Sequence, residues 1–85
     1  MLRRGGGEME ERLDGLKPGE GGAVTRLVMA PDRAASLIRL GLRPGTEIRC
    51  LRRAPLGDPA VYRFRGTTAA IRQKDAREIV IKKGS

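Results

Sequence analysis

The chain has 85 residues, enough for one small domain, and its 18 basic and 10 acidic side chains give a formal charge of +8. Such a charge points to nucleic acid, an anionic membrane or an acidic protein as partners. The sequence has no histidine, a single cysteine (Cys50) and no long apolar run. We therefore expect no internal disulfide, no membrane span and a cytoplasmic, reducing location. The usual general base and the commonest metal ligand are absent, so we expect no enzyme activity, no metal site and no cofactor.

Residues 1–11 are predicted to form a flexible tail. They include three consecutive glycines, Gly5 to Gly7, which carry a large ordering cost and bury nothing. Apolar anchors begin at Leu13, and Lys17-Pro18-Gly19 after it is a strong turn signal. The run from 23 to 29 is β-branched and too short for a stable helix, so it predicts the first strand.

One short α-helix is expected at about 32–40. Asp32 suits its N-cap, because the carboxylate can accept from the free N–H groups of the first turn. Its apolar face consists of Leu37, Ile38 and Leu40. Gly41 suits the left-handed position that ends a helix, and Leu42 can then pack back on that face. A helix this short is unstable alone in water, so we expect it to lie against the sheet.

Alternating apolar residues predict the next strands. In residues 46–53 the side chains of Ile48 and Cys50 share the buried face. Arg65-Gly66 predicts a two-residue hairpin turn between the strand ending at Phe64 and residues 67–72. The turn sets the register, with the pairs Phe64–Thr67, Tyr62–Ala69 and Ala60–Ile71. This register directs both aromatic residues of the chain inward.

A short helical turn near 74–78 and a closing strand at 79–81 complete the expected elements. The prediction is therefore a mainly β domain over residues 12–82, with a frayed end at 83–85. Five short antiparallel strands with one inserted helix would hide their edges best as a closed or nearly closed barrel.

The loop between the strands ending at Arg53 and starting at Ala60 is shaped by its own sequence, Ala54-Pro55-Leu56-Gly57-Asp58-Pro59. Its two prolines each fix φ and lack an N–H, and Gly57-Asp58 favours a reversal of the chain. Leu56 is an apolar side chain in an otherwise turn-forming run. It either folds back onto the core or stands out as an anchor for a partner.

RNA or single-stranded DNA is the alternative partner for a small basic barrel. Two observations make it the weaker interpretation. The chain has only two aromatic residues, and the predicted register turns both away from a base-stacking surface. The arginines are also spread along the sequence and form no single block.

The sequence resembles the family of ferrous iron transport protein A, FeoA. The resemblance rests on four motifs between Leu13 and Ile81: Leu13-x-x-Leu16-Lys17-Pro18-Gly19-x-x-Gly22, Leu40-Gly41-Leu42-x-Pro44-Gly45-Thr46, Arg52-Arg53-Ala54-Pro55-Leu56-Gly57-Asp58-Pro59 and Arg65-Gly66…Ile71-Arg72…Asp75-Ala76…Ile79-Val80. Two departures are the glycine-rich start and Thr67, where the family often has a larger residue. The resemblance implies an SH3-like barrel with an inserted helix. A similar barrel forms the C-terminal domain of DtxR-type repressors, but 85 residues leave no room for a winged helix.

The resemblance also implies a cytoplasmic accessory of FeoB, a membrane transporter for ferrous iron with a cytosolic G domain. We expect contact with that transporter to recruit the chain to the inner face of the membrane. The docking surface is predicted at Ala54, Pro55, Leu56, Gly57, Asp58 and Pro59, with Leu56 as anchor, and at Leu42 and Arg43 near the helix end. No small-molecule substrate is expected, and partly exposed sheet edges leave a homo-oligomer open.

Overall fold

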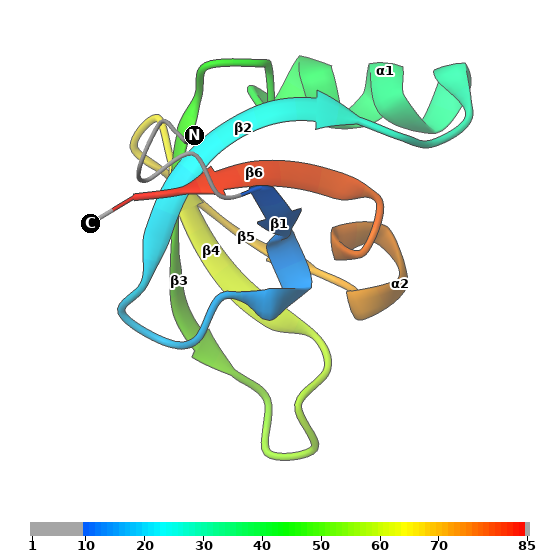
Figure 1. Cartoon of the computed structure of the whole chain (residues 1–85). Helices are drawn as coiled ribbons and strands as arrows, with labels where there is room; N and C mark the ends of the chain where they lie inside the picture. The colour runs from blue at the N-terminus through cyan, green and yellow to red at the C-terminus, as the bar shows by residue number, and fades with distance from the viewer. Residues whose placement is uncertain (1–9, 85) are drawn as a thin grey trace, which may run out of the picture.

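Six antiparallel strands form one curved sheet in the computed structural model, which describes residues 10–84 (Figure 1). The elements are β1 (Glu10–Arg12), the 3₁₀ turn η1 (Leu13–Gly15), β2 (Gly21–Leu27), α1 (Pro31–Leu40), β3 (Glu47–Arg53), β4 (Ala60–Phe64), β5 (Thr67–Ile71), α2 (Gln73–Ala76) and β6 (Ile79–Lys83). The strand order is β1-β6-β2-β3-β4-β5. The sheet is not closed, because β1 and β5 are its edges. The mainly β class is confirmed, with six strands where five were expected.

The additional strand is β1. Glu10 pairs with Lys82 and Arg12 with Val80 on β6, so residues 10 and 11 belong to the sheet and not to the predicted tail. Residues 1–9 of that tail lie outside the described residues. Three polar residues carry no strand pattern, and β1 forms because the edge of β6 supplies backbone partners beside the buried Leu13.

The C-terminal end is also held where fraying was expected. Lys83 belongs to β6, and the N–H of Gly84 donates to the carbonyl of Gly21 at 2.8 Å. Ser85 lies outside the described residues. The backbone of β2 therefore fixes the end of β6, which the sequence alone does not reveal.

The core lies inside the curved sheet. The predicted register of β4 and β5 is confirmed, with Phe64 opposite Thr67, Tyr62 opposite Ala69 and Ala60 opposite Ile71. Both aromatic side chains are only 1% exposed. Burial raises the pKa of Tyr62 to about 12 and also raises the pKa of the Cys50 thiol, which faces the same core.

Helix α1 begins one residue earlier than expected, with Ala30 and not Asp32 at its N-cap. Pro31 occupies the first turn, where a missing N–H costs nothing, and no side chain caps the helix. The predicted end is confirmed: Gly41 has φ 115°, and the N–H of Leu42 donates to the carbonyl of Leu37 at 3.0 Å.

The contact of α1 with the sheet is slighter than expected. Leu37 packs against the core, but Ile38 is 36% and Leu40 is 52% exposed, and no residue of α1 is fully buried. The helix lies across one end of the sheet (Figure 1). Its first turn is held there by ion pairs from Arg33 to Asp75 and Glu78. Only one of the three predicted apolar residues therefore joins the core.

Candidate functional site: the β3–β4 loop and the arginine groove

The loop of residues 54–59 joins β3 to β4 and projects from the end of the sheet opposite to α1 (Figure 1). The N–H of Ala54 donates to the carbonyl of Pro59 at 2.9 Å, and the N–H of Gly57 donates to the carbonyl of Ala54 at 2.7 Å. Gly57 has φ 91°, and the Asp58–Pro59 peptide bond is cis. Leu56 at the tip is 96% exposed. Of the two alternatives for Leu56, the structure has the exposed one.

The base of this loop is fixed on both sides. The carboxylate of Asp58 accepts a hydrogen bond from the N–H of Gln73 at 2.9 Å, which caps the start of α2. On the other side the guanidinium of Arg53 donates to the carbonyls of Asp14 and Leu16, each at 2.6 Å. Leu56 therefore stands on a loop whose shape is set before any partner arrives.

The predicted site residues at the helix end do not join this loop. Leu42 has 0% of its surface exposed and belongs to the core, so the prediction that it contacts a partner is corrected. Its burial follows from the helix end itself, which turns Leu42 back toward the sheet. Arg43 is exposed, but it lies between α1 and β3, and the whole length of β3 separates it from the loop.

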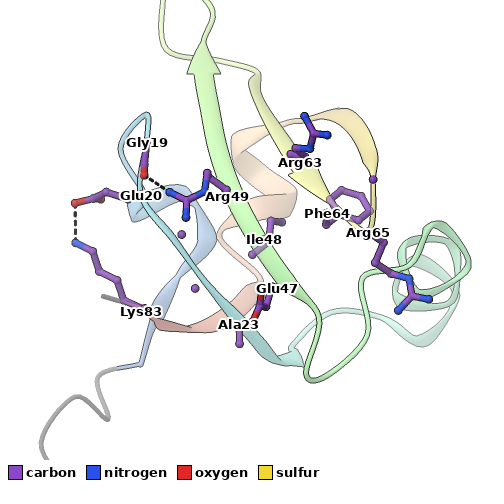
Figure 2. A pocket seen from close by; sticks show the side chains of 14 residues that line it. Gly19, Glu20, Ala23, Glu47, Ile48, Arg49, Arg63, Phe64, Arg65 and Lys83 are labelled. Carbon is purple, nitrogen blue, oxygen red and sulfur yellow. Dashed lines mark hydrogen bonds and ion pairs between the residues drawn. The ribbon is translucent and has the colours of Figure 1, made fainter.

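A second feature, which sequence reasoning missed, is an open groove of about 690 Å³. We call it the arginine groove; it is lined by Gly19–Ala23, Glu47–Arg49, Arg63–Gly66 and Lys83–Gly84. Arg49 on β3 and Arg63 on β4 are direct cross-strand partners, and both are exposed. Figure 2 shows that they come from neighbouring strands and that Arg49 turns toward Gly19. The guanidinium of Arg49 donates to the carbonyl of Gly19.

One wall of the groove is an ion pair. The Nζ of Lys83 lies 2.9 Å from a carboxylate oxygen of Glu20 (Figure 2). The backbone N–H of Lys17 and then the Lys83 ammonium lower the pKa of Glu20, and the Glu20 carboxylate raises the pKa of Lys83. Within residues 10–84, by contrast, neither Arg63 nor Arg65 takes part in an ion pair.

Strand alternation does place Arg49 and Arg63 on outward faces, and that signal was present in the sequence. The pairing of β3 with β4 was not, because a six-residue loop does not fix a register as a two-residue turn does. The ladder also shifts between Cys50 and Arg52, which breaks a simple count of pairs.

Among residues 10–84, no group of three or more His, Cys, Asp or Glu side chains could hold a metal ion. In the same range, no helix has the length and apolar character needed to cross a bilayer.

Comparison with known proteins adds the family. The model of the FeoA domain matches residues 11–83. The solution structure of FeoA from Chlorobium tepidum is 35% identical, with a TM-score of 0.78 over 84% of this chain and 69% of that one. No curated protein matches the sequence.

Two further structures are similar in fold. A zinc complex of FeoA from Stenotrophomonas maltophilia is 25% identical, with a TM-score of 0.74 over 86% of this chain and 94% of that one. It is described as a procaryotic SH3 domain protein and proposed as a bacterial ferrous iron transport activating factor. A manganese-dependent transcriptional repressor is 17% identical, with a TM-score of 0.78 over 88% of this chain and 42% of that one, and shares the fold alone. With a family match over residues 11–83, the chain belongs to the FeoA family.

Proposed function

We propose that this chain is a non-enzymatic accessory of a FeoB-type ferrous iron transporter and that it docks on the transporter's cytosolic side through the loop of residues 54–59. In this proposal the chain is cytoplasmic and reaches the membrane through its partner. The observation that carries it is Leu56, 96% exposed on a loop fixed at its base. Membership of the FeoA family supports a role in iron transport.

The loop around Leu56 should cost little free energy to order on binding. An isolated exposed leucine is common on protein surfaces, but this one stands at the tip of a loop held by Asp58 and Arg53. A partner that covers Leu56 gains about 1.5–3 kcal/mol from burial of the side chain and pays little to order the loop. That gain corresponds to roughly a tenfold to hundredfold change in affinity.

Capture of the transporter's cytosolic domain by immobilised protein tests this. Leu56→Asp should reduce capture by roughly tenfold or more, because a carboxylate cannot be buried in an apolar pocket. Leu40→Asp is the matched control, since Leu40 is 52% exposed on α1 at the opposite end of the molecule and should capture as wild type does. Each arm is run with and without guanine nucleotide. Unchanged capture by a folded Leu56→Asp protein would contradict the proposal.

Nucleic acid binding is the second candidate, because antiparallel pairing brings Arg49 and Arg63 together although they are far apart in the sequence. Both aromatic residues are buried, so bases have no aromatic surface to stack on. We therefore expect only non-specific, salt-sensitive affinity for oligonucleotides. Micromolar binding that persists at physiological salt would favour this candidate over the docking protein.

A further inference from the structure

The arginine groove contains two positive charges that the sheet itself does not need. Arg49 and Arg63 lie directly opposite each other on β3 and β4, and like charges in that position destabilise a sheet. Within residues 10–84 neither side chain forms an ion pair. In Figure 2 Arg49 points toward Gly19, and Arg63 points away from it. An anion placed between the two guanidinium groups would remove the repulsion.

The floor of the groove beneath Arg49 is glycine backbone. Gly21 on β2 is the cross-strand partner of Arg49 on the other side of β3. A Cβ at Gly21 would lie 3.0 Å from the carbonyl oxygen of Ile48 and 3.6 Å from the Cζ of Arg49. The Arg49 guanidinium therefore rests over bare backbone, held by the Gly19 carbonyl, with its remaining N–H donors unused in the described chain. Arg49 is thus held beside Gly19, and Arg63 points away from it.

The other charges in the groove indicate what kind of anion fits. Glu47 lies two residues before Arg49 and faces the same side of the sheet, and Glu20 occupies the wall with Lys83. A chain of phosphates running along the groove would meet the Glu47 carboxylate, whereas a single carboxylate between the arginines would not. Guanidinium groups bind a carboxylate through paired N–H···O bonds, which suits one acidic side chain.

We propose that Arg49 and Arg63 bind the carboxylate of one Asp or Glu side chain of a protein partner. This gives the partner a second contact, remote from the Leu56 loop. It rests on the proposed function only for the identity of that partner, since the site itself is defined by β2, β3 and β4.

The test uses ¹⁵N-labelled protein and two blocked peptides, acetyl-Val-Thr-Glu-Thr-Val-amide and its Gln counterpart, followed by NMR titration. We expect the Glu peptide to shift the signals of Gly21, Arg49 and Arg63, and the Gln peptide to bind about tenfold more weakly, as a lost charge-assisted hydrogen bond implies. Arg63→Gln should weaken the Glu peptide by a similar factor. Arg52→Gln is the matched control, because Arg52 is exposed on β3 but does not line the groove.

Three outcomes would overturn the inference: equal binding of the two peptides, an equal loss in Arg63→Gln and Arg52→Gln, or tighter binding of a thymidine hexanucleotide than of the Glu peptide. Dispersed spectra of each variant establish that it is folded. Leu56→Asp should bind the Glu peptide as wild type does. If Leu56→Asp also captured the transporter's cytosolic domain as wild type does, that result would contradict only the docking proposal and not the carboxylate site.

Discussion

The two halves of the sheet use their positive charges differently. In the half made of β1, β6 and β2, with α1 and α2 beside it, three cations form ion pairs with acids of neighbouring elements: Arg26, Arg33 and Lys83. These pairs are Arg26–Glu10, Arg33–Asp75, Arg33–Glu78 and Lys83–Glu20. On β3, on β4 and in the turn between β4 and β5, four arginines make no ion pair with any residue between 10 and 84: Arg49, Arg52, Arg63 and Arg65.

The two halves differ more in how many cations remain available to a ligand than in how much their ion pairs stabilise the fold. Ion pairs at a protein surface are screened by water and salt, so the paired half gains little from them. What they do is occupy the charges and fix α1 and the end of β6 in place. The unpaired half leaves its guanidinium groups available to a ligand, and it also carries the loop with Leu56. The exposed Leu56 and the Arg49–Arg63 pair thus lie in the same half.

Arg53 joins the two halves, and its removal should have the largest effect. Its guanidinium donates to the carbonyls of Asp14 and Leu16 beside η1. Arg53→Ala removes these charge-assisted bonds and should lower the free energy of unfolding by about 2–3 kcal/mol. Arg52→Ala, one residue earlier and exposed, should change it by no more than about 0.5 kcal/mol. Urea denaturation followed by circular dichroism measures both, and equal losses would refute the connection.

Asp58 is the second link between the halves, with a smaller expected effect. Asp58→Ala leaves the N–H of Gln73 without its acceptor and should cost about 1 kcal/mol of unfolding free energy. Asp58→Asn should recover most of that loss, because an amide oxygen also caps a helix. Thermal unfolding of the two variants compares them. If Asn and Ala destabilise equally, the carboxylate does not act as a cap.

Reversing the charge at Arg63 tests whether the unpaired arginines repel each other. Arg63→Glu places opposite charges across β3 and β4, so the free energy of unfolding should rise by about 0.5 kcal/mol at low salt. The gain should fall in 1 M salt, where screening is strong. Arg52 pairs with Val61, so Arg52→Glu should raise the free energy of unfolding less in the same urea titration. A destabilised Arg63→Glu protein would mean that the Arg49–Arg63 repulsion is negligible.

Acid should weaken the paired half first, with the smallest effect of the four. The folded-state pKa of Glu20 lies below its ordinary value of 4.5. Stability from this group is therefore complete above pH 4.5 and is lost as the pH falls through the lower, folded-state value. Glu20→Gln should lower the melting temperature slightly at pH 7 and show a shallower decline as the pH falls below 4.5. An identical decline in both proteins would assign the acid sensitivity to other carboxylates.

Local chemistry was enough to predict some elements before any contact was known. Arg65-Gly66 forces a two-residue turn, and with Tyr62 and Phe64 needing burial only one register remains, which the structure confirms. Gly41 ends α1 for an equally local reason, the left-handed backbone that glycine accepts. In both cases the determining residues are neighbours in the sequence.

What escaped prediction depends on distant partners. β1 exists through the edge of β6, some seventy residues later, and its own three residues contain no signal. The pairing of Arg49 with Arg63 required the register of β3 and β4, which the shift after Cys50 obscures. Exposure of Leu56 also could not be decided, since a flexible leucine at a loop tip fits either environment until the loop's hydrogen bonds are known.

The buried thiol of Cys50 offers a chemical probe of the protein interior. It is the chain's one thiol and has 0% of its surface exposed. A thiol reagent can modify it only when the sheet opens, so the rate of labelling by such a reagent reports how often β3 separates from its neighbours. The rate of labelling should be low in the free protein and lower still when a partner is bound. The difference between the two rates would measure complex formation. The chain thus carries an internal reporter of its own opening, in a position that no surface contact disturbs.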